Sequence, residues 1–195
     1  MLSYPLELSF KIVTIGTRIR VMDAAGRQVA YARKKKFKLK EDVMVYEDED
    51  QSRLRFRLKA DRVIDFSASY TITGPDGHPI GAVQRQGMKS MWKSAYSLAD
   101  ARGNQIGVIH EENPWVKVLD GLMEMIPFGD ALGGLFFNPA YLADLRGATV
   151  LRVQKERAVL ESKFTIEKRG DFSEEEEQVL LAGTIMMLML ERDRG

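Results

Sequence analysis

Two stretches of this 195-residue chain concentrate cations among apolar residues. The cations are Arg33, Lys34, Lys35, Lys36, Lys38 and Lys40 in the first stretch and Arg53, Arg55, Arg57 and Lys59 in the second. Because alternate residues of a strand point to opposite faces, the interleaved Phe37, Leu39 and Phe56 predict strands with one cationic face. Such a face could attract anionic phospholipid headgroups, at about 1 kcal/mol per cation close to the surface.

An alternative role for the same cations is to solvate a strand face and discourage pairing with another sheet edge. Acidic side chains near the turn between the stretches favour this alternative, because they could neutralise the cations. They are Glu41, Asp42, Glu47, Asp48, Glu49 and Asp50. Nucleic acid is not an expected partner, since one basic face without a recognised reading element is not a DNA-binding signature.

A second candidate contact surface lies in an apolar insertion, residues 113–139. Its large apolar side chains include Trp115, Phe128, Leu135, Phe136 and Phe137. A mobile apolar insertion could enter a bilayer interface or bind a protein partner. The alternative that we favour is a lid that covers one end of the fold and buries these aromatic side chains.

Residues for enzymatic chemistry are scarce. The chain has no cysteine and two histidines, His78 and His110, which excludes disulfides, thiolate sites and a histidine-rich metal centre. Both histidines lie among polar residues, and we expect them to be exposed and metal-free. Without a phosphate-binding loop, a dinucleotide glycine pattern or a nucleophile elbow, the sequence predicts a non-enzyme with no cofactor.

Charge and the N-terminal residues bear on location. The formal net charge is +1, so no global field draws the protein toward nucleic acid or membrane. The first ten residues lack the basic-then-apolar pattern of a signal peptide, which predicts the cytoplasm, with peripheral membrane association as an option.

The elements that would position these residues follow from an internal repeat. Its turn positions are Gly26, Gln51, Gly77, Gly103 and Gly147, which are separated by 25, 26, 26 and 44 residues. Seven residues before each turn stand Ile19, Met44, Tyr70, Tyr96 and Ala140, and five before it stand Val21, Tyr46, Ile72, Leu98 and Leu142. Three residues after it stand Val29, Leu54, Ile80, Ile106 and Val150. The pattern predicts five hairpins, each burying these positions on one face.

Five hairpins provide ten strands, and residues 6–13 and 162–168 bring the expected number to twelve. Closing such a meander into an antiparallel barrel removes its exposed edges. After a Ser-x-x-Glu helix start at Ser173, residues 179–190 carry no charge. That run spans about 18 Å as a helix, short of roughly 30 Å of bilayer hydrocarbon. We therefore favour a buried core helix over residues 173–192, plugging the barrel, rather than a membrane anchor.

The hairpin form Tyr-x-apolar-x-Asp-x-x-Gly-x-x-Ile-Gly, the Asn-Pro-Trp at 113–115, the Phe-Asn-Pro-Ala-Tyr at 137–141 and the apolar C-terminal helix resemble the Tubby C-terminal-like superfamily. The similarity is greatest to its LURP-one-related and phospholipid scramblase-like branch and covers about residues 6–191. It implies a twelve-stranded barrel around a helix, with phosphoinositide binding or membrane association. A cysteine cluster for acylation and an acidic calcium-binding segment are absent, so lipid transport is not expected.

Together these features predict one domain over residues 1–195 that is mainly β, a closed barrel around its C-terminal helix. The expected function is that of a non-enzymatic cytosolic module that associates with a membrane surface or with anionic phospholipid headgroups. The alternative is a protein-interaction or scaffolding barrel without a lipid ligand, acting through residues 113–139. Neither the partner nor the oligomeric state follows from the sequence.

Overall fold

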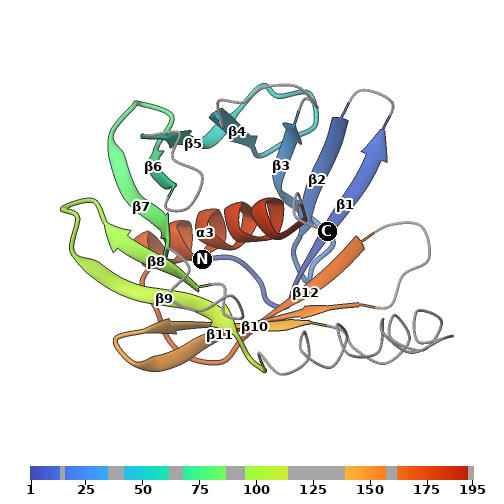
Figure 1. The fold of residues 1–195 in the computed structure, drawn as a ribbon. Helices are drawn as coiled ribbons and strands as arrows, with labels where there is room; N and C mark the ends of the chain where they lie inside the picture. The colour runs from blue at the N-terminus through green and yellow to red at the C-terminus, as the bar shows by residue number, and fades with distance from the viewer. Residues whose placement is uncertain are drawn as a thin grey trace, which may run out of the picture.

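The computed structural model describes residues 1–13, 16–34, 42–61, 68–86, 95–113, 139–156 and 162–192. In these residues twelve antiparallel strands form a closed barrel, in which each strand pairs with its neighbours in sequence and β1 pairs with β12 (Figure 1). The strands are β1 (Leu6–Val13), β2 (Gly16–Met22), β3 (Gln28–Lys34), β4 (Asp42–Tyr46), β5 (Leu54–Ala60), β6 (Ser69–Thr73), β7 (Pro79–Arg85), β8 (Ala95–Asp100), β9 (Gln105–Glu111), β10 (Ala140–Leu145), β11 (Ala148–Lys155) and β12 (Ser162–Lys168). The predicted fold class is confirmed.

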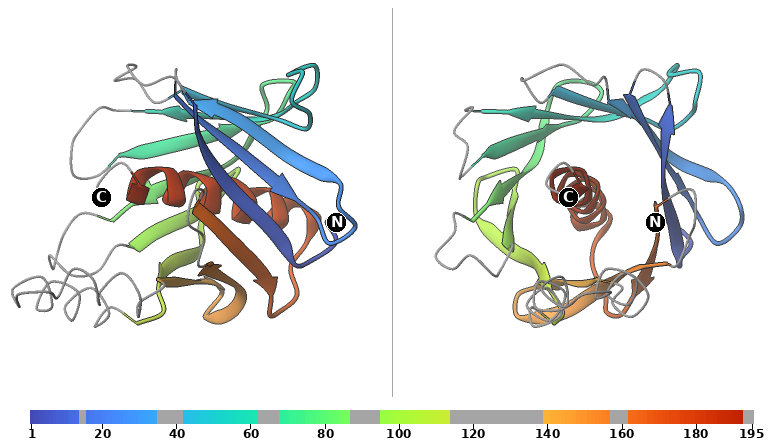
Figure 2. Two further views of the ribbon diagram at one scale, coloured as in Figure 1. Left: turned by 90° about the vertical axis from the view of Figure 1, so that its right-hand side faces the viewer. Right: turned by 45° about the vertical axis from the view of Figure 1, so that its right-hand side comes forward.

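The helix α3 (Glu174–Arg192) runs through the middle of the ring of strands (Figure 2). Every residue from 179 to 189 is buried, which is the environment that a helix apolar on all sides requires. At its start, the Glu176 N–H donates to Ser173 Oγ at 3.2 Å and the Ser173 N–H donates to Glu176 Oε2 at 2.8 Å. The predicted capping box and core helix are therefore confirmed.

The apolar run of α3 was also weighed as a membrane anchor. Within the described ranges, no helix combines the length and the apolar character that crossing a bilayer requires.

Glycines allow α3 to lie close against β7 and β8. A Cβ on Gly183 would lie 2.6 Å from Leu98 Cδ2. A Cβ on Gly81 would lie 2.4 Å from the Ala99 carbonyl oxygen and 2.9 Å from Val179 Cγ2. These separations are below van der Waals contact, so the absence of side chains sets how closely helix and wall pack.

Three hairpin turns are built on the same aspartate bond. Oδ1 of Asp23, Asp48 and Asp100 accepts the N–H group four residues further on, at 2.9 Å in each case. The backbone φ is positive at all five predicted turn positions, including 58° at Gln51, the one that is not glycine. These turns share one end of the barrel with the start of α3, and we call this end the turn end.

Before the turn, the predicted phase of burial is correct for the first, third and fourth hairpins and wrong for the other two. After the turn, Val29 and Val150 are buried as predicted, whereas Leu54, Ile80 and Ile106 are half-buried. Ile19, Val21, Tyr70, Ile72, Tyr96 and Leu98 are buried as predicted. Val43, Val45, Tyr141 and Ala143 are buried in place of Met44, Tyr46, Ala140 and Leu142. The β4–β5 hairpin closes through the Glu47 N–H and the Arg53 carbonyl, whereas the β2–β3 hairpin closes through the Asp23 N–H and the Arg27 carbonyl, so the β4–β5 turn has one more residue on each side. The β10–β11 hairpin turns through only two residues with positive φ, Arg146 and Gly147. A shift of one residue exchanges the two faces of a strand.

Met187→Asp tests the core role of α3. Met187 is fully buried in an apolar lumen, so an isolated carboxylate there should cost several kcal/mol, comparable with the total free energy of unfolding. Denaturant unfolding followed by circular dichroism measures this loss. Gln178→Asp, on the half-buried side of the first turns, should change the free energy of unfolding by less than about 1 kcal/mol. Equal stability of the two variants would contradict the core assignment.

The aspartate turns predict a dependence of stability on acid. The N–H groups of Arg27 and Ser52 lower the pKa of Asp23 and Asp48, and the Asn104 side-chain amide lowers that of Asp100, below the ordinary 3.8. Because the folded pKa values are depressed, this stabilisation is complete above about pH 4 and is lost as pH falls through the folded values.

Asp100→Asn should therefore flatten the decline of unfolding free energy between about pH 4 and pH 2. Chemical denaturation at a series of pH values measures that slope. Asp171→Asn, an exposed aspartate outside the turns, serves as the control. An unchanged slope in Asp100→Asn would show that its turn bonds do not couple to folding.

Candidate functional site

The structure pairs three of the predicted site cations with acids, and the weakest of these pairs is that of Arg55 with Glu47, at 3.9 Å. Arg53 lies 3.4 Å from Glu47 and 3.5 Å from Asp48. Arg57 donates two hydrogen bonds to Asp42, at 2.7 and 2.5 Å, and these bonds raise the pKa of its guanidinium. For Arg53 and Arg57, therefore, the neutralised alternative is the one that the structure supports.

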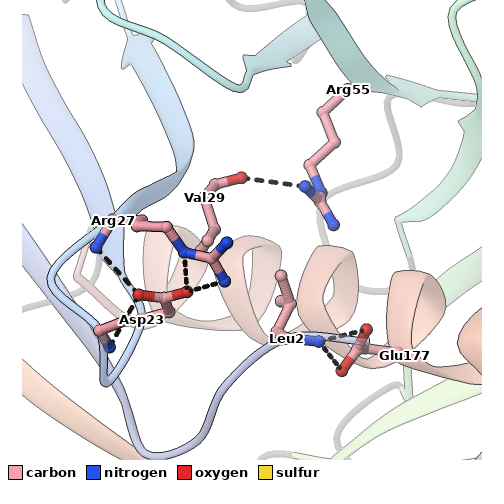
Figure 3. A network of polar contacts seen from close by, with 7 residues as sticks. Leu2, Asp23, Arg27, Val29, Arg55 and Glu177 are labelled. Carbon is pink, nitrogen blue, oxygen red and sulfur yellow. Dashed lines mark hydrogen bonds and ion pairs between the residues drawn. The ribbon is translucent and has the colours of Figure 1, made fainter.

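Arg55 is a correction to the predicted cationic face. It is the extra residue of a bulge, because Tyr46 pairs with Leu54 and Val45 with Phe56. Its side chain is 20% exposed, and its guanidinium donates to the Val29 carbonyl at 3.2 Å. Figure 3 shows it pointing from β5 toward α3, at the turn end of the barrel. A bulge releases a side chain from strict alternation, and this one leaves the outer face.

Two predicted cations lie on the outer wall with no ion pair or hydrogen bond to another described side chain. They are Arg33 near the end of β3 and Lys59 near the end of β5, and both are exposed. Lys59 stands opposite Asp42 in the strand register, so an acid is its direct neighbour. Arg33 stands opposite another cation, Arg18 of β2.

Several predicted site residues lie outside the described part of the chain. Lys34 ends β3, and its side chain is not described. The others are Lys35, Lys36, Lys38 and Lys40 in the first basic stretch and Trp115, Phe128, Leu135, Phe136 and Phe137 in the insertion. Their roles stay predictions.

The register brings together a set of cations that the sequence did not show. Lys11 of β1 pairs directly with Arg18 of β2, which pairs directly with Arg33 of β3. All three are exposed, because Phe10, Ile19 and Ala32 beside them point into the barrel. We call Lys11, Arg18 and Arg33 the basic row. Their alternation with the buried Phe10 and Ile19 is the signal that could have marked Lys11 and Arg18 as outward-facing, but only the pairing of three strands aligns them with Arg33.

The basic row is electrostatically costly for an isolated fold. Like charges directly opposite one another on neighbouring strands destabilise the pairing. Arg20, the next outward-facing residue of β2, differs from Arg18 because it forms an ion pair with Glu49. Among the described residues, no acidic side chain pairs with Arg18 or Arg33. Because neighbouring strands lie about 5 Å apart, the backbones that carry Arg18 and Arg33 are close, and these two cations suit a ligand with closely spaced negative charges.

The two histidines differ in environment. His78 is 83% exposed in the β6–β7 turn, as predicted. His110 is an exception, because it lies half-buried on β9, with Nε2 2.9 Å from Asp144 Oδ2 and Nδ1 3.0 Å from the Glu111 carbonyl. Both ring nitrogens therefore lie at hydrogen-bond distance from an oxygen of the protein. In the described ranges no three His, Asp or Glu side chains converge on a metal position.

Buried polar groups hold both ends of the barrel. At the turn end, the Glu177 carboxylate accepts the Leu2 N–H at 3.0 and 3.1 Å (Figure 3). Burial, followed by the charge of Glu177, raises the pKa of Tyr4. At the other end, Tyr96 donates to Glu191 at 2.7 Å, and burial raises the pKa of Tyr96. Because their bonds join elements of the fold, these groups serve structure.

A half-open cavity of about 610 Å³ lies at the turn end, beside the first turns of α3. Ile80, Ile106 and Val179 give it apolar surface. Its charged groups are largely used internally, since Arg146 pairs with Glu176 and Asp100 is bonded within its own turn. The cavity therefore offers mixed surface, since Arg102, Glu175 and Gln178 line it beside the apolar side chains.

Comparison with protein-family models gives no match, and neither curated proteins nor solved structures include one that matches this chain. The likeness to the Tubby C-terminal-like superfamily is therefore retained as a proposal, and the function is argued from the site.

Glu177→Leu tests the structural role of the turn-end network. The change leaves the Leu2 N–H without its acceptor inside a largely buried site, which should cost about 1–3 kcal/mol of unfolding free energy. Thermal and denaturant unfolding measure the loss. Glu175→Leu, at an exposed position two residues earlier, should stay within about 0.5 kcal/mol of the unaltered protein. A neutral Glu177→Leu would show that the N-terminal segment does not close the barrel.

Proposed function

We propose that this protein is a non-enzymatic cytosolic module that associates with anionic phospholipid surfaces through the basic row. The observation that carries the proposal is the direct pairing of Arg18 with Arg33 on the outer wall, where no described acidic side chain neutralises either residue. A fold with a net charge of +1 and many ion pairs nevertheless keeps this destabilising arrangement. An anionic partner would relieve the repulsion.

The resemblance to the Tubby-like superfamily supports the same choice of ligand, since membrane association is what it implies. The cations Lys34, Lys35, Lys36 and Lys38 follow Arg33 directly in the sequence and would add to the attraction. At about 1 kcal/mol per cation near the surface, the basic row alone would give weak binding, which salt should oppose.

Vesicle co-sedimentation of the double variant Arg18→Ser/Arg33→Ser tests this function. The protein should bind vesicles of phosphatidylcholine with phosphatidylserine at low salt, and it should not bind phosphatidylcholine alone. Removing two cations should weaken binding by about 2 kcal/mol, roughly thirtyfold. Raising salt from about 0.01 to 0.1 M shortens the screening length from roughly 30 to 10 Å and should weaken binding of the unaltered protein.

Arg102→Ser/Lys155→Ser is the matched control, since it removes the same charge from the β8–β9 turn and from β11. It should lose much less affinity than the basic-row variant. Equal losses would show that net charge acts rather than the basic row. If the unaltered protein ignores anionic vesicles even at low salt, the lipid function is wrong and the scaffolding alternative replaces it.

A further inference from the structure

One large apolar side chain is exposed on the outer wall beside the basic row. Among the described residues, Met1 and Met44 are the exposed large hydrophobic side chains, and Met44 is 42% exposed. Three other methionines, Met186, Met187 and Met189, are buried in α3. The exposure of Met44 results from the shifted phase of β4, in which Val43 and Val45 face the lumen.

Met44 stands between two arginines of the neighbouring strands. It pairs directly with Arg57 of β5. On the other side Ala32 pairs with Val45, so Arg33 and Met44 are the next residues along β3 and β4. Because this row continues from Lys11 and Arg18, the basic row leads directly to an apolar side chain.

Aromatic side chains support Met44 on the same face. The Tyr46 hydroxyl donates to Met44 Sδ at 3.2 Å. Tyr46 pairs with Tyr31 of β3. Tyr31 is 4% exposed, although Arg20, which pairs with Tyr31 from β2, is exposed. Met44 is therefore exposed beside the half-buried Tyr46, with Tyr31 buried next to them, and we call Met44 and Tyr46 the Met44 strip.

A cationic row next to an exposed methionine and a half-buried tyrosine matches the chemistry of a bilayer interface. Cations meet the headgroup phosphates, while tyrosine and methionine side chains suit the boundary between headgroups and acyl chains. A soluble polyphosphate would use the cations and would leave Met44 in water. The two sources of phosphate thus make different demands on the same wall.

We propose that the Met44 strip enters the headgroup region of an anionic bilayer, so that the site takes a lipid surface rather than a free phosphate compound. This inference rests on the proposed function, and it adds the part of the wall that contacts the lipid. The barrel then lies against the membrane by the wall of β1–β4, with α3 still enclosed.

Single-cysteine labelling tests the insertion directly, because the chain has no cysteine of its own. Met44→Cys carries an environment-sensitive nitrobenzoxadiazole label, and Gln105→Cys, exposed on β9 across the barrel, carries the matched control label. With phosphatidylcholine–phosphatidylserine vesicles, the label at 44 should shift to shorter wavelength, brighten and be quenched by spin-labelled lipid. The label at 105 should keep its emission in buffer.

Met44→Ser separates the lipid surface from a free phosphate compound. It should weaken vesicle binding roughly fivefold, because the variant lacks the exposed half of the methionine side chain, whose transfer from water to the bilayer favours binding. Its affinity for inositol hexakisphosphate at low salt should equal that of the unaltered protein. Circular dichroism confirms the fold of each variant.

The outcomes separate this inference from the proposed function. If the protein co-sediments with anionic vesicles while the label at 44 stays as in buffer, the insertion is wrong and the function stands. If Met44→Ser binds vesicles as tightly as the unaltered protein, the apolar contribution is likewise wrong. If no vesicle binding occurs at all, the proposed function and the inference both fail.

Discussion

A helix whose residues 179–190 carry no charge is stable in water only when protein surrounds it, and enclosing α3 constrains the rest of the molecule. Strands closed into a ring give such a helix an apolar wall on every side. In the described strands, the pairing of β1 with β12 also closes the barrel, so the first and last strands both have a partner. The wall must approach closely where helix and strands are nearest, and Gly81 and Gly183 remove the side chains that would prevent it.

At its two ends, an enclosed helix brings polar groups next to an apolar lumen, and these groups need hydrogen-bond partners. Buried hydrogen bonds, rather than apolar side chains, close the barrel there. Glu177 accepts the Leu2 N–H at the turn end, and Glu191 accepts the Tyr96 hydroxyl at the other. Glu177 and Glu191 are therefore explained by the closure of the fold. A search for function is directed to the outer wall.

On that wall, ion pairs account for many of the charges. Arg57 with Asp42, Arg53 with Glu47 and Arg20 with Glu49 pair cations with acids along β2, β4 and β5. The basic row differs because its members face one another across strands. The Met44 strip differs because an apolar side chain is exposed beside cations. Neither feature helps the isolated fold, and together they define the surface that we assign to the membrane.

The sequence by itself determined the architecture, because its features are local. The five turn positions and the uncharged run of α3 each depend on residues close in the sequence, and each was predicted correctly. Single-residue differences between hairpins escaped prediction. An extra residue before the β4–β5 turn exposed Met44, and a bulge turned Arg55 away from the outer face. The alignment of Lys11, Arg18 and Arg33 was decided by tertiary structure alone. Residues stand opposite one another only in a particular strand register, and turns and bulges elsewhere in the strands set that register.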